Sequence, residues 1–173
     1  MQAMFTVGIL TISDKGSRGE REDKSSEAIR EVISRLDARI VDYAIVPDDR
    51  KLICEKLVGW ADDGRIDVVV TTGGTGLAPR DVTPEATLDA LDKVAPGFAE
   101  AMRAESFRKT PHAILSRGVA GIRKKTLIIN LPGSPKAARE CLQVILPALP
   151  HAVETAKGEA GECATAEKES LAG

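Results

Sequence analysis

A glycine-rich segment with a carboxylate nearby is the part of this sequence best suited to chemistry. Residues 72–76 read Thr72-Gly73-Gly74-Thr75-Gly76, follow a run of β-branched apolar residues, and precede Asp81. Glycine permits positive φ angles and close approach, so such a segment can direct backbone N–H groups at an anion. It lacks the lysine of a Walker P-loop and the G-x-G-x-x-G spacing of dinucleotide sites. Taken alone, such a segment is more often a structural turn than an anion-binding loop.

A second segment of the same kind stands later in the chain. Residues 130–135 (NLPGSP) end a predicted strand and precede a predicted helix, and Pro132, Gly133 and Ser134 supply a turn, an adaptable backbone and a hydroxyl. Two strand ends therefore present possible anion cradles, and a nucleotide or phosphorylated substrate would engage both. Proline and glycine after a strand are also ordinary turn residues, so a purely structural role stays open.

An aspartate beside a phosphate site would repel the ligand unless a cation lies between them. Magnesium sites commonly use one or two carboxylates together with substrate phosphate oxygens. Asp81 is one candidate ligand for Mg²⁺, and Asp48, which follows another predicted strand, is the second. Each could instead cap the helix that follows it. Because Asp48 and Asp49 both precede one helix, capping alone would account for one of that pair.

Other polar residues are weaker candidates for contact with a substrate. Ser13 and Asp14, together with residues 23–25, could contact substrate, although a solvated loop followed by a helix cap explains them about as well. Ser116 and Arg117 could bind a phosphate group. These residues therefore join the candidate site as binding residues only.

The remaining titratable residues predict no further site. The basic residues 123–125 are favoured as a solvated turn before a strand. His112 and His151 lie far apart in the sequence without a third partner, so neither a metal site nor a catalytic triad is predicted. Cys54 and Cys141 fall on the apolar faces of predicted helices and are interpreted as core residues.

The candidate residues follow the strands of a predicted α/β fold. Buried-type apolar runs predict strands at residues 5–12, 39–46, 67–72 and 127–131. Apolar spacing and capping residues predict helices at residues 25–36, 50–62, from 83 onward, within 94–108 and at 136–146. This alternation predicts a three-layer α/β/α sandwich with a largely parallel sheet.

The sheet predicts where the candidate residues meet. In open parallel sheets, ligands bind beyond the carboxyl ends of the strands, where the following helices point their N-termini. Four loops of this chain occupy such positions: residues 13–19, 47–49, 72–81 and 132–135. We expect these loops to wall one pocket.

Composition limits the class of protein. The chain has 173 residues, 43% hydrophobic and 29% charged, which fits one globular domain, predicted over residues 1–156, followed by a flexible tail at 157–173. A net charge of -2 gives no basic field for nucleic acid, and the first apolar run is too short to span a membrane. The three cysteines form no C-x-x-C pattern. No disulfide framework or zinc site is expected, and a cytoplasmic location fits.

Several motifs together resemble one known family. Residues 11–19 (TISDKGSRG), 47–49 (PDD), 71–87 (TTGGTGLAPRDVTPEAT), 114–119 (ILSRGV) and 127–136 (LIINLPGSPK) are similar to the molybdopterin-binding domain of molybdenum cofactor biosynthesis, the MogA/MoaB type. The resemblance runs from about residue 6 to residue 153. The order of several long motifs carries it, whereas Gly-Gly-Thr-Gly alone would be weak.

The resemblance implies a reaction and a set of roles. Such proteins are typically molybdopterin adenylyltransferases, in which the terminal phosphate of molybdopterin attacks the α-phosphorus of Mg-ATP and releases pyrophosphate. By this resemblance Asp48 and Asp81 are the magnesium-linked catalytic residues, residues 73–76 lie against a nucleotide or pterin phosphate, and Gly133 with Ser134 forms a second wall. The family assembles as trimers or hexamers, and hand-over of product to a molybdate-inserting protein is expected.

Two other functions stay open at this point. A relative of this type could bind molybdopterin or act as an oligomeric scaffold with little transferase activity, and both aspartates would then be helix caps. A hydrolase or deamidase related to the competence-damage domain shares the architecture. That group carries an acidic cluster in place of residues 75–83, so we regard it as the weakest of the three.

Overall fold

One six-stranded sheet organises the molecule. The computed structural model describes residues 4–159. The strand order is β2-β1-β3-β6-β5-β4. Four strands are mutually parallel: β1 (Phe5–Ile12), β2 (Ala38–Val46), β3 (Val68–Thr72) and β6 (Thr126–Leu131). Two short antiparallel strands, β5 (Ala120–Arg123) and β4 (Lys93–Val94), complete one edge. The prediction of a largely parallel sheet is confirmed.

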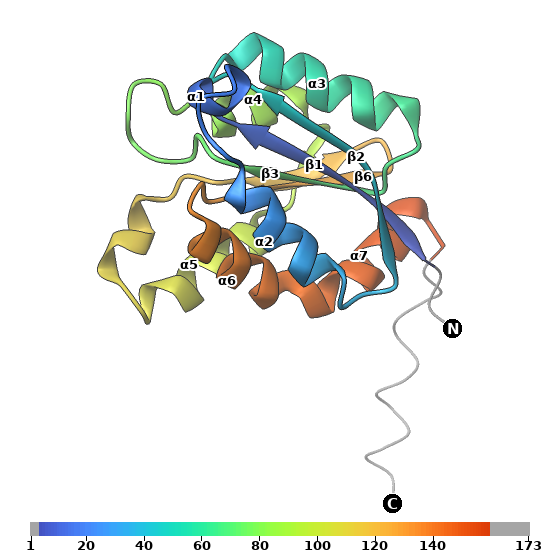
Figure 1. Cartoon of the computed structure of the whole chain (residues 1–173). Helices are drawn as coiled ribbons and strands as arrows, with labels where there is room; N and C mark the ends of the chain where they lie inside the picture. Colours follow the sequence, from blue (N-terminus) through green and yellow to red (C-terminus); the bar gives the residue numbers. More distant parts are fainter. Residues whose placement is uncertain (1–3, 160–173) are drawn as a thin grey trace, which may run out of the picture.

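Helices cover both faces of this sheet and make the predicted three layers (Figure 1). One layer holds α3 (Arg50–Asp63) and α4 (Thr83–Ala90). The other holds α2 (Lys24–Ile33), α5 (Pro96–Phe107), α6 (Pro135–Ile145) and α7 (Leu149–Lys157). Three short elements, α1 (Asp14–Ser17), η1 (Pro111–Leu115) and η2 (Leu146–Ala148), lie in the connections.

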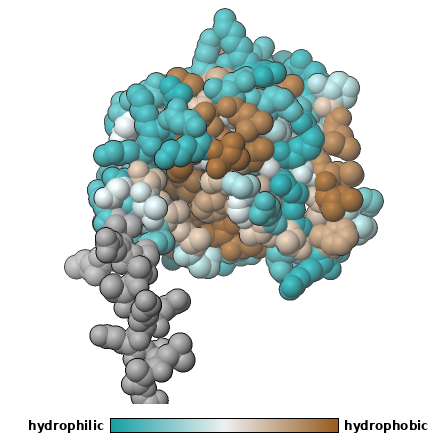
Figure 2. All heavy atoms as spheres, turned by 180° about the vertical axis from the view of Figure 1, so that it is seen from behind, coloured by the Kyte–Doolittle hydropathy of each residue, from teal (hydrophilic) through white to brown (hydrophobic). Residues whose placement is uncertain are grey.

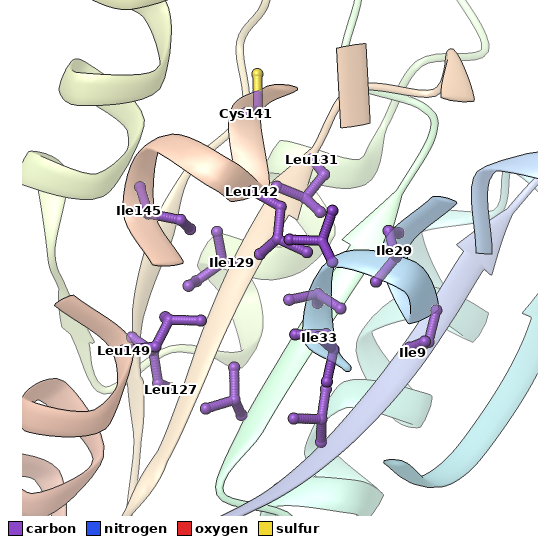
Figure 3. Close-up of a cluster of buried hydrophobic side chains, with 14 of the residues drawn as sticks. Ile9, Ile29, Ile33, Leu127, Ile129, Leu131, Cys141, Leu142, Ile145 and Leu149 are labelled. Atoms are coloured by element: carbon purple, nitrogen blue, oxygen red, sulfur yellow. The ribbon is translucent and has the colours of Figure 1, made fainter. Parts of the chain in front are cut away.

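The strands read as continuous apolar runs because each buries both of its faces. All five residues of β3 are buried. Alternate side chains of a strand point to opposite faces, so Val68 and Val70 join the core under α2 and α6 while Val69 joins the core under α3 and α4. The larger core includes Ile29, Leu142 and other aliphatic side chains (Figure 3). Aliphatic packing thus fixes the sheet between its two helical layers.

The strand register brings the functional loops to one edge. Thr72 at the end of β3 pairs with Thr11 of β1 and with Leu131 of β6, and Ile12 pairs with Val46 of β2. The four parallel strands therefore end level with one another. The loops that leave them must start side by side, which is what a shared site requires.

Some elements differ from the sequence-based prediction. The helix predicted to reach residue 36 ends at Ile33, and α1, α7 and the two antiparallel strands were not predicted. Of the predicted tail, residues 160–173 lie outside the described residues, and the domain boundary stays a prediction. Within residues 4–159, no helix is long and apolar enough to cross a membrane.

Candidate active site

A cavity of about 890 Å³ lies where the four loops meet. Its size is within the usual range for ligand sites. All four loops that follow the parallel strands contribute to its wall, as predicted. The predicted site residues in this lining are Ser13, Asp48, Thr72, Gly73, Gly74, Asp81, Gly133 and Ser134.

Two glycines shape the loop after β3. Gly73 has a φ of 103°, and a Cβ at this position would lie 2.2 Å from the carbonyl oxygen of Ile12. Gly74 has a φ of 67°, and a Cβ there would lie 2.3 Å from the Thr83 hydroxyl oxygen. L-residues with side chains rarely adopt such φ values. Both positions therefore require glycine, and the backbone at the cavity wall stays bare.

The second glycine segment packs directly on the first. A Cβ on Gly133 would lie 3.2 Å from the Cα of Gly73. The Thr72 hydroxyl donates to the carbonyl of Pro132 at 2.7 Å, and the Ser25 hydroxyl donates to the carbonyl of Gly133 at 2.6 Å. These bonds join the loops after β3 and β6 to the start of α2, so three segments form one continuous wall.

Two helices begin at this wall. Asp23 caps α2 by accepting from the N–H of Ser26, and Ser134 caps α6 by accepting from the N–H of Ala137. Both caps line the cavity. The N-terminus of a helix carries a partial positive charge. The Asp23 carboxylate already occupies that of α2, whereas α6, capped by the neutral hydroxyl of Ser134, favours an anion in the cavity.

Asp48 is not a helix cap, whereas its neighbour is. Asp49 accepts from the N–H of Leu52 and caps α3. Asp48 instead accepts from the N–H of Asp14 at 3.0 Å, and the carboxylate of Asp14 accepts from the N–H of Asp48 at the same distance. Burial raises the pKa of Asp48, the Asp14 backbone bond opposes this, and the charges of Asp14 and Asp81 add to the rise. A half-buried carboxylate facing other carboxylates gains from a bound cation.

Asp81 supplies the second carboxylate of the cavity. Its Oδ2 accepts from the N–H of Ala78 at 3.1 Å, which closes the turn of residues 78–81. Among residues 4–159, no hydrogen bond is made to Oδ1 of either Asp48 or Asp81. Each carboxylate therefore keeps one oxygen for a ligand.

A magnesium ion fits this donor set. Within residues 4–159, no group of three or more His, Cys, Asp or Glu residues is arranged to hold a metal. Two oxygen-donating aspartates in one cavity match magnesium, which takes few protein ligands and completes its shell with water and phosphate oxygens. Asp48 and Asp81 are the residues that could hold it.

Arg80 ties the glycine loop to the loop after β1. Its guanidinium donates to both carboxylate oxygens of Asp14, at 2.7 and 3.0 Å. The hydrogen bond from Arg80 holds the pKa of Asp14 below its usual range, and the backbone bond of Asp48 adds to this. Asp14 lies outside the cavity lining and links three loops, and its contact with substrate stays a prediction.

The other predicted binding residues surround the cavity without lining it. Thr75 is buried, Gly76 lies behind Asp81, and Pro132 and Ser116 line a separate cavity of about 250 Å³ between α5, η1 and α6. Arg117 lies outside both linings. Its guanidinium donates to the protein itself, namely to carbonyls of the glycine loop and to Glu85.

Sequence reasoning missed part of the wall. The charged residues 20–22 line the cavity beside Asp23. Burial alone would raise the pKa of Asp23, but hydrogen bonds from the Thr11 and Tyr43 hydroxyls outweigh burial and lower it. The signal was present, because this charged run belongs to the connection between β1 and α2, which leaves the carboxyl end of β1.

The residues interpreted as structural keep that interpretation. Cys141 is buried in the core and Cys54 is half-buried. The basic residues 123–125 include the turn between β5 and β6, where Arg123 forms a bidentate pair with Asp62. His112 lines the smaller cavity. None of these residues lines the larger cavity.

Comparisons with known proteins agree with the geometry. The family described as "Probable molybdopterin binding domain" matches residues 8–151. This chain belongs to that family. Molybdopterin adenylyltransferase of Helicobacter pylori strain J99 is 51% identical over 154 residues, which cover 88% of each chain. The molybdopterin adenylyltransferase of Escherichia coli K12 is 44% identical over 139 residues, 79% of this chain and 71% of that protein.

Solved structures of the molybdopterin-binding domain family have the same fold. The molybdopterin biosynthesis enzyme MoaB of Thermus thermophilus superposes with a TM-score of 0.85 at 56% identity, covering 89% of this chain and 97% of that one. The protein CinA of Thermoplasma acidophilum, at 16% identity and a TM-score of 0.63, shares the fold alone. The resemblance predicted from the motifs is therefore confirmed.

Proposed function

We propose that this protein is a molybdopterin adenylyltransferase that acts in molybdenum cofactor biosynthesis. The observation that carries the proposal is the pairing of two aspartates, Asp48 and Asp81, in one cavity walled by two glycine-containing loops. Such a cavity suits two phosphorylated substrates and a divalent cation. Relatives at 43–51% identity that are named molybdopterin adenylyltransferase support the same activity.

The reaction transfers AMP between two phosphate groups. An oxygen of the terminal phosphate of molybdopterin attacks the α-phosphorus of ATP and forms a new P–O bond. The bond from the α-phosphorus to the oxygen that bridges it to the β-phosphate breaks, and pyrophosphate leaves with that electron pair. The products are adenylyl-molybdopterin and pyrophosphate.

The chain contributes mainly position and charge. The bare backbone at Gly73 and Gly74 lets a phosphate approach the wall closely. The N-terminus of α6, which is capped by the neutral hydroxyl of Ser134, attracts its negative charge. Gly133 and Ser134 continue the same wall. Preorganised donors of this kind stabilise the charge that develops at phosphorus without reorganising during the reaction.

Asp48 and Asp81 are proposed to hold Mg²⁺ through their unbonded Oδ1 atoms. When bound, Mg²⁺ neutralises phosphate charge and polarises the phosphorus oxygens. Burial first, and then repulsion from Asp14 and Asp81, raises the pKa of Asp48, and a bound cation would relieve that repulsion. The carboxylate beside the glycine loop is thereby explained.

Assembly and location belong to the same proposal. Large apolar side chains are exposed, with Leu77 at 64% and Ile114 at 66%. Apolar side chains gather in patches on one face of the molecule (Figure 2). Exposed apolar patches are typical of interaction surfaces, which supports a homotrimer or homohexamer. We place the reaction in the cytoplasm, with hand-over of the product to a molybdate-inserting protein.

Formation of the product tests the proposed function. Purified protein is incubated with molybdopterin, ATP and Mg²⁺, and adenylyl-molybdopterin and pyrophosphate are measured by mass spectrometry and a phosphate assay. We expect both products in equal amounts, and neither after chelation of Mg²⁺. Tight binding of molybdopterin without any adenylylated product would contradict the transferase and favour a binding or scaffold protein.

A further inference from the structure

Arg117 makes an unusual set of contacts for a residue outside the cavity. Its backbone N–H donates to the carbonyl of Thr75 at 2.8 Å. Its Nε donates to the carbonyl of Gly76 and one Nη to the carbonyl of Asp81, both at 2.8 Å. Its other Nη is ion-paired with Glu85 of α4. All three guanidinium nitrogens are therefore engaged by one loop and the helix that follows it.

These contacts close the glycine loop at its base. Gly76 and Asp81 stand at the two ends of the turn, and one planar guanidinium binds the carbonyl of each. The spacing between the two carbonyls is thereby fixed by the width of a rigid group. Among the described residues, Arg117 is the only one whose side chain donates a hydrogen bond to Asp81, and it does so at the Asp81 carbonyl.

The position of the Asp81 carboxylate depends on this closure. A Cβ on Gly76 would lie 2.8 Å from Oδ2 of Asp81, so the carboxylate packs against the Gly76 backbone. Its Oδ2 accepts from Ala78 within the same turn. A shift of the turn would therefore move the carboxylate relative to Asp48 across the cavity.

We propose that Arg117 is a positioning residue that sets the Asp81 carboxylate in place for binding of the magnesium–nucleotide complex. The proposal rests on the proposed function, because it assigns Asp81 to that complex. Arg117 itself touches neither cation nor phosphate. This role differs from the direct phosphate contact that the sequence suggested for the same residue.

A lysine cannot replace this group. It carries the same charge but offers one ammonium centre in place of a flat fork of donors. Arg117→Lys would keep charge near Glu85 and lose the simultaneous bonds to Gly76 and Asp81. Glu85→Gln keeps the fork and removes only its ionic anchor, so it should have the same effect in a weaker form.

Calorimetric titration with an ATP analogue that has a methylene group between the α and β phosphates tests the proposal. Affinity is measured with Mg²⁺ and with EDTA for the native protein, Arg117→Lys, Asp81→Asn and the double variant. We expect Arg117→Lys to weaken binding about 10-fold with Mg²⁺, the usual scale for residues that orient metal ligands, and less than about 2-fold with EDTA. In the Asp81→Asn background, Arg117→Lys should change affinity less than about 2-fold, because coupled residues are not additive.

Arg123→Lys is the matched control. Arg123 is also a part-buried fork, bonded to Asp62 and to the carbonyl of Ala90, but it lies at the opposite edge of the sheet. This variant should alter thermal stability without changing the affinity for the magnesium complex. If Arg117→Lys does not fold, the comparison is made with Glu85→Gln, for which a several-fold loss restricted to the Mg²⁺ titration is expected.

Three results would overturn the proposal. Equal weakening with Mg²⁺ and with EDTA would mean that Arg117 binds the nucleotide directly. Equal losses in the native and Asp81→Asn backgrounds would mean a general structural role. Unchanged affinity in Arg117→Lys would remove Arg117 from the site. If the native protein itself shows no Mg²⁺-dependent binding, the proposed function fails together with the role of Arg117. In the other three results the native protein still binds with Mg²⁺, so only the role of Arg117 fails.

Discussion

Two adjacent aspartates illustrate how position, and not residue type, decides function. Asp49 caps α3, while Asp48 faces Asp14 and Asp81 at the cavity. Both follow the same strand, so their sequence context could not separate the cap from the ligand. The structure separates them, because only Asp48 combines partial burial with a free carboxylate oxygen. At the scale of a residue, the proposed magnesium site depends on this difference between Asp48 and Asp49.

The pH dependence of the reaction should report the environment of Asp48. Burial raises its pKa above the ordinary value, with repulsion from Asp14 and Asp81 adding to the rise. Asp48 must be ionised to bind a cation, so activity should fall on the acidic side at a pH above the ordinary range of an aspartate. Asp14→Asn removes one repulsive charge, which should lower that pKa and move the acidic limb to lower pH. A rate–pH profile of each variant measures this, and an unchanged or raised limb would contradict the assignment.

At the scale of an element, the glycine loop adopts backbone conformations that residues with a side chain rarely adopt. The backbone of Gly73 packs on the carbonyl of Ile12. The guanidinium of Arg117 bonds the carbonyls of Gly76 and Asp81. Thr83, the first residue of α4, donates through its hydroxyl to the carbonyl of Gly73, and Val82 precedes the helix without a side-chain cap. The first side chain of α4 thus stabilises the glycine loop and does not cap the helix.

Substitution of Gly73 should damage the loop and leave the rest of the fold. Gly73→Ala places a Cβ 2.2 Å from a backbone oxygen at a φ of 103°, which should lower the free energy of unfolding by about 1–3 kcal/mol. Binding of the magnesium–nucleotide complex should weaken by at least about 10-fold. Urea denaturation and calorimetry measure the two effects.

Gly59→Ala is the control for that substitution. Gly59 lies inside α3, and a Cβ there would have no heavy atom within 4 Å. Alanine in a helix interior is more favourable than glycine by about 0.5–1 kcal/mol. This variant should therefore be at least as stable as the native protein and bind equally well. Equal damage from both substitutions would contradict the role assigned to the Gly73 backbone.

Much of this arrangement could be predicted from the sequence, for identifiable reasons. Buried strands such as β1 and β3 can be recognised in the sequence by their apolar runs. In a parallel sheet, the loops that follow such strands lie together at the carboxyl ends of the strands. The antiparallel strands β4 and β5 are two and four residues long, too short to give a pattern. The role of Arg117 could not be predicted, because its partner Gly76 is 41 positions away in the sequence.

At the scale of the whole molecule, the cavity and the ion-pair cluster around Asp62 lie at opposite ends of the parallel strands. The carboxyl edge carries the repelling carboxylates of the cavity. The amino edge carries Asp62 between Arg123 and Lys124, an attractive arrangement that links α3 to the β5–β6 turn. The hydrogen bond from Arg123, followed by that from Lys124, lowers the pKa of Asp62 to about 2. This ion-pair cluster lies away from the cavity.

Stability should therefore depend on Asp62 in a limited pH window. Its pKa is lower in the folded than in the unfolded chain, so its contribution is present above the ordinary value of 3.8 and is lost as the pH falls toward about 2. Asp62→Asn should lower the melting temperature near neutral pH, and the difference from the native protein should shrink through that window. Thermal unfolding followed by circular dichroism at several pH values measures it, and a difference independent of pH would refute the ionic explanation.

The proposal that Asp48 and Asp81 hold the magnesium of the reaction is tested by a single-turnover adenylylation assay. The assay compares Asp48→Asn, Asp81→Asn and Asp49→Asn across a range of Mg²⁺ concentrations. Asparagine is as good a helix cap as aspartate, so Asp49→Asn should keep the native rate. Asp48→Asn and Asp81→Asn should each lose at least about 100-fold in rate at moderate Mg²⁺, while molybdopterin still binds. Native rates in both cavity variants, or an equal loss in Asp49→Asn, would contradict the claim that these two carboxylates hold the magnesium of the reaction.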